Sequence, residues 1–372
     1  MKRFFFNLTL CGFLIFLSCE KPKTAFDLFA EQYTDVDFHL TGGKIIDGTG
    51  EPAMKADLLI KGDEIVFIGE VDSQRIKIGK TISAKGMVIT PGFIDPHSHG
   101  DPLKTPEFTN FLAMGVTSIS LGQDGFSPDY IDLNPWIKVV DSLQTGPNIL
   151  PFIGHGTLRE LSGVGLKANP DENDILKMEE ILRNGLEAGC WGMTTGLEYT
   201  PGRFASVKEL ESLARVVGEY DGIIMSHVRN EDDDQIEHSI RELLNQGKFC
   251  RVQVSHLKSV YGKGQKRAEE LLALLDSARQ EGIEVTADVY PYTASYTGIS
   301  IVFPDWAKPP YDFQSVRKNR RAELADFLRK RVTKRNGPEA TIFGSGPYAG
   351  KTLAEVAASL NKPFEDVLID DI

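Results

Sequence analysis

The chain has 372 residues, 41% of them apolar, and a formal net charge of -12. This length and apolar content suffice for one large α/β barrel or two ordinary domains, and they exclude a disordered chain. Because acidic and basic residues are mixed along the chain and form no basic groove, the charge argues against nucleic-acid partners.

The first residues, MKRFFFNLTLCGFLIFLSCE, have a basic start, an apolar run that is short for a membrane span, and a small residue before a cysteine. These features are typical of an export signal. The ending FLSC resembles a bacterial lipoprotein cleavage site, although Phe16 departs from the usual leucine-like residue. We expect residues 1–19 to be the signal, with Cys19 becoming the lipidated first residue, and residues 20–35 to be a tether. The protein would then be an exported lipoprotein in the periplasm or at the cell surface; a plain secretory signal or a short membrane anchor is the alternative.

Short alternating segments separated by glycine turns follow. This spacing is typical of strands joined by tight turns, and it predicts a small β domain over residues 36–87.

From residue 88 the rhythm changes to apolar strand, loop, amphipathic helix and glycine, which predicts a second domain over residues 88–372. The clearest helix is QKRAEELLALLDSARQEG, with Gly282 as its stop. Repeated strand and helix pairs indicate a parallel sheet, and the count favours a (β/α)8 barrel over a doubly wound sheet, which would carry a dinucleotide fingerprint. The predicted strands are 88–95, 116–122, 148–154, 191–197, 222–228, 249–257 and 283–292.

Four of the seven histidines follow predicted strands. His97 and His99 come after the first strand, and because residues i and i+2 of an extended segment share a face, they project together. His227 and His256 end the fifth and sixth strands, about 30 residues apart, which is the length of one strand–helix–strand unit. All four should therefore meet at the carboxyl end of the barrel, where imidazole nitrogens suit zinc. Taken alone, the HxH pair is equally consistent with ordinary histidines.

An oxygen or sulfur ligand usually completes such a site, and Asp124 after the second strand offers one. Asp-Gly is also an ordinary turn signal, so its position alone favours a turn.

The remaining polar candidates have weaker contexts. The stretch GHGTLR, with His155, Thr157 and Arg159, follows the third strand; we expect it to shape the pocket, with His155 behind the ligands. The acidic run NEDDD reads as a helix start and not as a cation site. His39 and His238 have no such context. Cys190 and Cys250 lie in apolar stretches and are expected to be buried free thiols.

Taken together, these stretches resemble the amidohydrolase superfamily and, within it, the N-acyl-D-amino-acid deacylases (D-aminoacylases). In chain order the matching stretches are GGKIIDGTGEPAMKADLLIKGDEIVFIGE, PGFIDPHSHGD, GVTSISLGQDGFS, GHGTLR, GMTTGLEYTPGRFAS, SHVRNEDD, VQVSHLKSVYGKG and VTADVYPYTAS. They extend from residue 36 to about residue 300. The resemblance implies a metal-dependent (β/α)8 barrel with a small N-terminal β-sandwich domain.

The resemblance also implies the site. His227 and His256 would hold one zinc ion tightly, and His97 and His99 would form the other half of the centre, with a second, weaker metal. Asp124 stands where well-known members have a cysteine ligand, which leaves the affinity and the number of metals open. Tyr199, Lys258 and Tyr290 would grip the carboxylate of the amino acid. No lysine at a strand end is placed to serve as a carboxylated ligand.

The leading functional prediction is zinc-dependent hydrolysis of the amide bond of an N-acyl-D-amino acid, so that the partner is a small molecule. Another amidohydrolase activity, on cyclic amides or dipeptides, is the neighbouring alternative. A surface-anchored binding lipoprotein that has lost catalysis is the third. The sequence leaves the acyl group, the side chain and the oligomeric state open.

The last expectation concerns the end of the chain. Seven barrel strands can be found, but an eighth strand carrying the family's catalytic aspartate cannot. We therefore expect a C-terminally truncated fragment whose general base lies beyond residue 372, and which does not deacylate at an enzymatic rate. If the chain were active, Asp288 would be the first candidate for the base.

Overall fold

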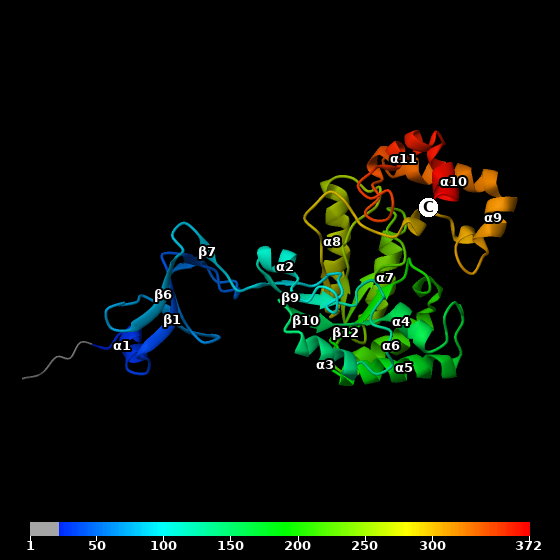
Figure 1. The fold of residues 1–372 in the computed structure, drawn as a ribbon. Coiled ribbons are helices and arrows are strands. Elements are labelled where there is room, and N and C mark those ends of the chain that lie inside the picture. The colour runs from blue at the N-terminus through cyan, green and yellow to red at the C-terminus, as the bar shows by residue number, and fades with distance from the viewer. Residues whose placement is uncertain (1–21) are drawn as a thin grey trace, which may run out of the picture. The chain divides into compact units, whose positions relative to one another are not determined.

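The computed structural model describes residues 22–372 and divides the chain after Gly92 into two compact units (Figure 1). The export signal and Cys19 lie outside the described residues, so both stay predictions.

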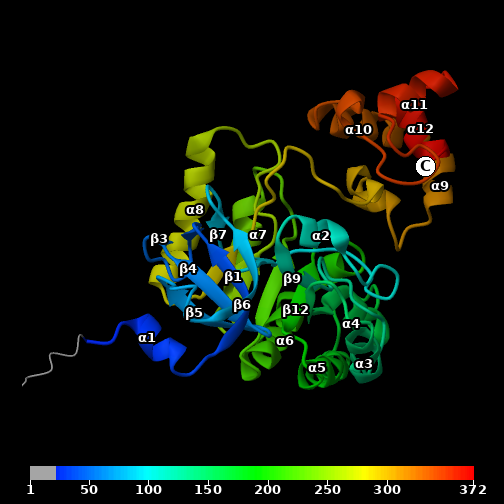
Figure 2. The ribbon, with the colours of Figure 1, turned by 60° about the vertical axis from the view of Figure 1, so that its left-hand side comes forward.

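The first unit is a small β domain, as predicted, with two sheets (Figure 2). In the larger sheet β1 pairs antiparallel with β4 and parallel with β6. Its strand order is β5 (Glu64–Gly69), β4 (Asp57–Lys61), β1 (Asp35–Thr41) and β6 (Lys77–Ser83). The smaller sheet contains β3 (Met54–Lys55), β2 (Lys44–Ile45) and β7 (Val88–Ile89).

Two expectations about this unit need correction. Part of the predicted tether, residues 20–35, forms helix α1 (Ala25–Ala30), which buries Phe26 and Phe29 in the core of the β domain. The two aromatic residues are three positions apart and therefore share one helix face. The domain boundary also moves from residue 87 to Gly92, because β7 pairs with β2 of the small domain instead of continuing into the barrel.

The second unit contains the seven predicted strands as neighbours in chain order, all parallel. Their bounds are β8 (Phe93–Asp95), β9 (Val116–Leu121), β10 (Asn148–Pro151) with β11 (Ile153–Gly154), β12 (Gly192–Gly196), β13 (Ile223–His227), β14 (Arg251–Val254) and β15 (Val285–Ala287). The third strand is interrupted at Phe152, so that β10 bonds to β9 and β11 to β12. Within residues 22–372, β8 and β15 are each paired along one edge.

Crossover helices connect these strands and supply the main core. They are α2 (Thr109–Ala113), α3 (Asn134–Ser142), α4 (His155–Leu161), α5 (Glu172–Glu187), α6 (Val207–Glu219), α7 (Ile236–Gln246) and α8 (Gln265–Gln280). Helix α8 confirms the clearest helix prediction, and Gly282 follows it with a φ of 89°. Buried leucine, isoleucine and valine side chains of α5, α6 and α7 pack against β11 to β14. On this core, the loops at the carboxyl ends of the strands carry the polar residues of the candidate site.

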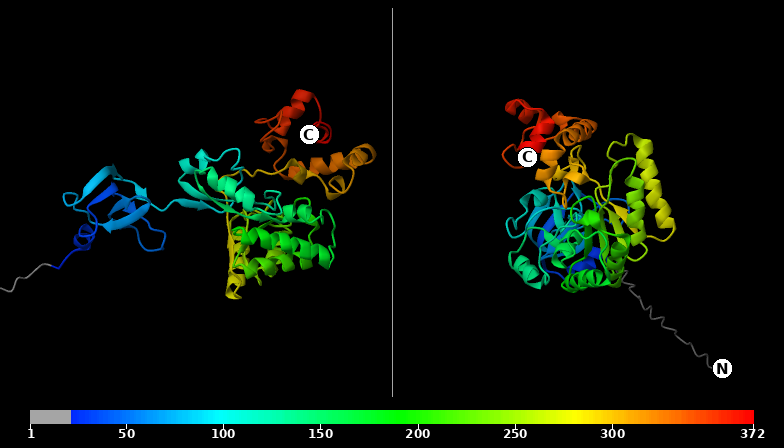
Figure 3. Two further views of the ribbon diagram at one scale, coloured as in Figure 1. Left: turned by 60° about the horizontal axis from the view of Figure 1, so that its bottom comes forward. Right: turned by 90° about the vertical axis from the view of Figure 1, so that its right-hand side faces the viewer.

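After β15 the chain forms a helical cluster with a core of its own (orange to red in Figure 3). Its helices are α9 (Phe313–Asn319), α10 (Arg321–Lys334), α11 (Leu353–Leu360) and α12 (Phe364–Asp370), preceded by short 3-10 turns. The cluster contacts a barrel loop through Arg331, which pairs with Asp232 at 2.7 Å.

The cysteines agree with the sequence prediction in part, because only Cys190 is fully buried. Cys190 is buried and Cys250 half-buried, and both are free thiols. Burial raises the pKa of each thiol to about 12, so that neither is ionised near neutral pH. None of the helices in residues 22–372 has the length and apolar character needed to span a bilayer.

Candidate metal centre

Asp124 occupies a sharp turn just beyond the end of β9. Its φ is 56°, in the left-handed region, and glycines with positive φ stand at positions 122 and 125. The backbone is packed tightly here, because a Cβ atom added at Gly196 would lie 2.0 Å from the Asp124 carbonyl oxygen. Asp124 is thus a turn residue, as the Asp-Gly pair predicts, and the turn also directs its carboxylate to the carboxyl ends of the strands.

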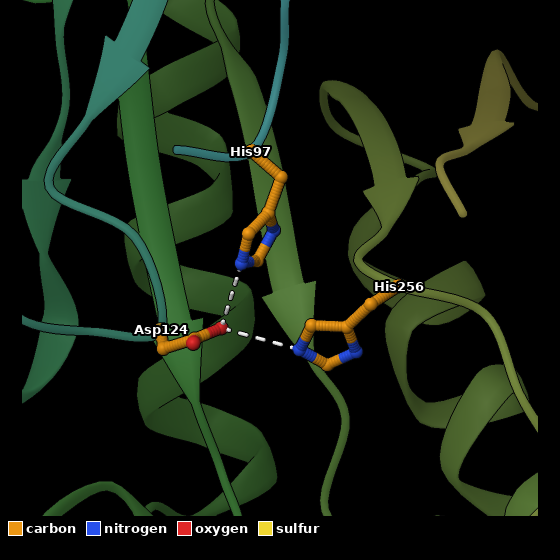
Figure 4. A group of neighbouring side chains, drawn as sticks. All are labelled: His97, Asp124 and His256. Carbon is orange, nitrogen blue, oxygen red and sulfur yellow. Dashed lines mark ion pairs between the residues drawn. The ribbon is translucent and has the colours of Figure 1, made fainter. Parts of the chain in front are cut away.

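The four strand-end histidines surround that carboxylate. Atom Oδ1 of Asp124 lies 3.5 Å from His97 Nε2, 3.8 Å from His227 Nδ1 and 3.4 Å from His256 Nε2. The other oxygen, Oδ2, lies 3.3 Å from His99 Nε2. Figure 4 shows the carboxylate between the rings of His97 and His256. The structure therefore brings all five predicted metal ligands to one place.

The spacing of these atoms fits a metal ion. Zinc bonds of about 2.0 Å to nitrogen and oxygen separate the ligand atoms of a tetrahedral site by roughly 3.3 Å. The distances from Asp124 Oδ1 to His256 and His97 are 3.4 and 3.5 Å, and His227 Nδ1 lies 3.0 Å from His256 Nε2. Asp124 Oδ1 is also buried and has no hydrogen-bond partner among residues 22–372. A buried carboxylate oxygen without a donor is suited to a cation.

Charge favours the ionised carboxylate as well. Burial is the largest single influence on the pKa of Asp124 and raises it, but His256, His97 and His99 together outweigh burial and hold that pKa far below its usual range. A carboxylate that stays ionised offers its lone pairs to a metal without first losing a proton.

Two glutamates contact His227 and His256, which we call the inner histidines; His97 and His99 are the outer histidines. Glu231 Oε1 lies 3.0 Å from His256 Nδ1, and Glu198 Oε2 lies 3.1 Å from His227 Nε2. Each glutamate thus faces the ring nitrogen that points away from Asp124. Carboxylates in this position orient metal-binding histidines and raise their basicity.

Burial disfavours the charged forms of Glu231 and His256, but hydrogen bonds and neighbouring charges outweigh it. For Glu231 burial is the largest influence and raises its pKa, but contacts with His256, His227 and Lys258 lower it to about 2. Burial also disfavours the charged form of His256 and so lowers its pKa, but Asp124 and Glu231 raise that pKa to about 9. The two groups therefore stabilise each other in charged form.

Sequence reasoning missed both glutamates. The acidic run NEDDD was expected to be a helix start, but α7 begins at Ile236, and the side chain of Glu231 is 5% exposed. The position of Glu231, four residues after His227, was the available signal. Glu198 lies beside Tyr199 in GLEYTPG and carried no signal of its own.

Asp288 supports the same pair from the seventh strand. Its Oδ1 accepts the backbone N–H of His256 at 2.6 Å, and its Oδ2 accepts from Gln253 Nε2 at 2.6 Å. The nearer nitrogen of His97, Nδ1, is 4.0 Å away. Because both oxygens already accept short hydrogen bonds, Asp288 suits an anchoring role better than that of a proton acceptor.

The outer histidines have less support. His97 Nδ1 is buried, and no described residue offers it a hydrogen bond. The side chain of His99 is 64% exposed, and Asp124 is its only ion-pair contact among residues 22–372. This half of the centre is therefore less firmly held.

Two of the three predicted substrate residues, Tyr199 and Lys258, contact His227 and His256, and the third, Tyr290, lies near Lys258. The ring of Tyr199 is centred 4.5 Å from that of His227, and its hydroxyl lies 3.1 Å from Thr297 Oγ1. Lys258 Nζ lies 3.0 Å from His256 Nδ1 and 5.9 Å from the ring centre of Tyr290. The ammonium group of Lys258 beside this centre is suited to holding an anion.

The other histidines lie outside this centre. His155 is fully buried, and its Nε2 lies 2.8 Å from Glu209, which also binds Arg159. His39 pairs with Asp57 in the small β domain at 2.9 Å, and His238 is exposed on α7. None of them belongs to a group of potential metal ligands among residues 22–372.

Comparison with known proteins gives relatives along most of the chain, although no family model matches it. It is 31% identical to the N-acyl-D-glutamate deacylase of Alcaligenes xylosoxydans xylosoxydans over 350 residues, which are 87% of this chain and 65% of that protein. The D-aminoacylase of the same organism is 29% identical over 70% of this chain and 58% of its own length. The chain thus spans somewhat less than two thirds of these curated relatives.

Solved structures give the same grouping. The N-acyl-D-glutamate deacylase of Bordetella bronchiseptica, complexed with zinc and a phosphonate mimic of the tetrahedral intermediate, matches with a TM-score of 0.73 and 28% identity. This match covers 89% of the present chain and 69% of that one. A D-aminoacylase described as defining a novel subset of amidohydrolases matches with a TM-score of 0.69 at 24% identity, which supports the barrel-type fold.

Proposed function

Because this chain belongs to the amidohydrolase superfamily, in the subset of the N-acyl-D-amino-acid deacylases, we propose that it takes part in zinc-dependent hydrolysis of the amide bond of N-acyl-D-amino acids. The products are a carboxylate and a free D-amino acid. The observation that carries the proposal is the convergence of four histidines on Asp124, in a chain similar to a deacylase that binds zinc.

The donor set fits zinc in type as well as in spacing. Imidazole nitrogen and carboxylate oxygen are both ordinary zinc ligands, so aspartate at position 124 is compatible with the metal. We assign the tight site to Asp124, His227 and His256, and a weaker second site to His97 and His99. When bound, zinc would polarise the amide carbonyl as a Lewis acid and lower the pKa of a water molecule.

The chain's own residues would orient the substrate. Lys258, with its ammonium group, and the hydroxyls of Tyr199 and Tyr290 would hold the carboxylate of the amino acid. Because Tyr199 contacts His227 and Lys258 contacts His256, they would hold the carboxylate at one end of the centre and the neighbouring amide close to it. Holding the reacting groups in this way contributes to rate through orientation.

The general base stays a prediction. Asp288 is the nearby acid on the seventh strand, but its hydrogen bonds to His256 and Gln253 favour an anchoring role. We propose that Asp288 positions His256 and does not act as the general base. Weaker zinc binding by Asp288→Asn than by the parent would support the anchoring role, and unchanged zinc affinity would contradict it.

The experiment for the proposed function compares substrates and metals. The full-length chain is loaded with zinc, and hydrolysis of N-acetyl-D-glutamate, N-acetyl-D-aspartate and N-acetyl-D-leucine is followed beside their L-enantiomers, hydantoin and dihydroorotate. The proposal expects any zinc-dependent turnover to be confined to the D-amides. Turnover of a cyclic amide or of the L-enantiomers alone would contradict it, and tight zinc binding without turnover would favour the binding-protein alternative.

We also propose that the protein is exported and anchored through lipidated Cys19. A lipidated cysteine carrying several acyl chains gives stable membrane attachment. Mass spectrometry of the protein from its own membranes should find the amino terminus at acylated Cys19, and an unmodified terminus elsewhere would contradict the anchor.

A further inference from the structure

One oxygen of Glu231 meets two nitrogen groups at once. Its Oε1 lies 3.0 Å from His256 Nδ1 and 2.5 Å from Lys258 Nζ, and these two nitrogens lie 3.0 Å from each other. The three side chains are 5%, 11% and 25% exposed, respectively. Little water therefore separates them.

When His256 is neutral, as a metal ligand must be, these contacts allow two exclusive arrangements of protons. A neutral imidazole has one N–H and one lone pair, whereas an ammonium group only donates. If His256 Nδ1 carries the proton, it donates to Glu231, and Nε2 is free to offer its lone pair beside Asp124. If Lys258 donates to Nδ1 instead, the proton of His256 is on Nε2 and occupies the metal side. The first arrangement is the one that can bind a metal.

The charges of Lys258 and Glu231 also affect metal binding at His256. The ammonium group of Lys258 lies beside a metal ligand, so it repels a divalent cation bound at the far side of the ring. The carboxylate of Glu231, in contact with Lys258, offsets that repulsion. Removing the carboxylate would leave the half-buried positive charge of Lys258 unpaired next to His256, where water screens the repulsion only in part.

We propose that Glu231 is a positioning residue that holds His256 in its metal-binding form against the competing contact of Lys258, and thereby makes the anion-binding lysine compatible with the metal centre. This inference rests on the metal centre of the proposed function and adds to it the residue that links metal and substrate binding.

The structure supplies a matched control in Glu198. It faces the outer nitrogen of His227 at 3.1 Å, as Glu231 faces that of His256, but no lysine contacts it among the described residues. A general loss of support for a histidine would therefore follow from either substitution. Only the loss at Glu231 should depend on Lys258.

The test measures the zinc dissociation constant of the full-length chain by competition with a chromophoric chelator, for the parent, E231Q, E198Q, K258M and the doubles E231Q/K258M and E198Q/K258M. Loss of a carboxylate behind a histidine ligand typically weakens metal binding about 10–100-fold, and we expect this for both single glutamine variants. Lys258→Met should recover at least half of the E231Q loss on a logarithmic scale and none of the E198Q loss.

Two results would overturn the inference. E231Q affinity within about twofold of the parent would overturn the inference, because a supporting carboxylate should cost much more than that. Equal recovery of both glutamine variants by Lys258→Met would also overturn it, since Lys258 would then act only through its overall charge.

If thermal melting shows that E231Q does not fold, K258M alone decides. The inference expects K258M to bind zinc at least as tightly as the parent, and weaker binding would overturn it. The proposed function is judged separately: a parent chain that binds no zinc refutes both, whereas a parent that binds zinc without turnover leaves the inference standing.

Discussion

The two halves of the candidate metal centre share Asp124 but differ in what stands behind them. The inner half, His227 and His256, is buried and backed by Glu198, Glu231 and Asp288. In the outer half His97 Nδ1 has no hydrogen-bond partner among the described residues, and the side chain of His99 is 64% exposed. Similar donor atoms are thus fixed to different degrees, and we expect the half with supporting carboxylates to bind zinc more tightly.

Replacing the group that both halves share should have the largest effect. Asp124→Ala removes the one carboxylate that contacts all four histidines, and we expect zinc binding to weaken by more than about 100-fold, beyond the usual loss of a supporting residue. Metal content after dialysis measures it, with Asp129→Ala, at an exposed position in the same loop, as the control. Tight zinc retained in Asp124→Ala would show that Asp124 is only a turn residue.

Removing one inner or one outer histidine compares the halves directly. We expect His256→Ala to abolish the tight site, a loss of about 100-fold or more, and His97→Ala to cost about tenfold or less, because the inner ligands keep their supporting carboxylates. Chelator competition at one salt concentration gives both values. A larger loss in His97→Ala than in His256→Ala would reverse the assignment of the two halves.

Zinc should also stabilise the barrel unit. A ligand at 100 times its dissociation constant adds about 2.7 kcal/mol to the free energy of unfolding, which should raise the melting temperature by several degrees. Calorimetry with and without zinc measures the change, and His256→Ala should remove most of it. An equal zinc-dependent shift in His256→Ala would place the stabilising metal elsewhere.

The smallest effect is expected at the exposed histidine. His99→Ala should change the affinity for the first zinc ion by less than about threefold, while weakening a second ion, because its ring contacts only the shared carboxylate. Isothermal titration separates the two binding events. Loss of the first event in His99→Ala would mean that the exposed ring is part of the tight site.

The histidines could be predicted from sequence because a regular rule places them. Residues at the ends of parallel strands meet at one edge of the sheet, so the strand pattern alone brings His227 and His256 together. The supporting glutamates obey no such rule: an acid beyond a strand is usually solvated, and only the packed loops show that Glu231 is buried.

The small domain gives the same lesson. Phe26 and Phe29 have helical spacing, but a six-residue helix is too short to be identified until the core that it covers is known. The position of β7 likewise depends on its pairing with β2, a contact between residues far apart in sequence.

We expect the inner half, His227 and His256, to bind the first zinc ion. Titration of the metal-free, full-length chain with zinc, followed by NMR of labelled histidine rings assigned through single substitutions, tests it most directly. The first equivalent of zinc should shift the ring resonances of His227 and His256. The ring resonances of His99 should stay unchanged until more metal is added. A first equivalent that shifts His99 and leaves His227 and His256 unchanged would contradict it.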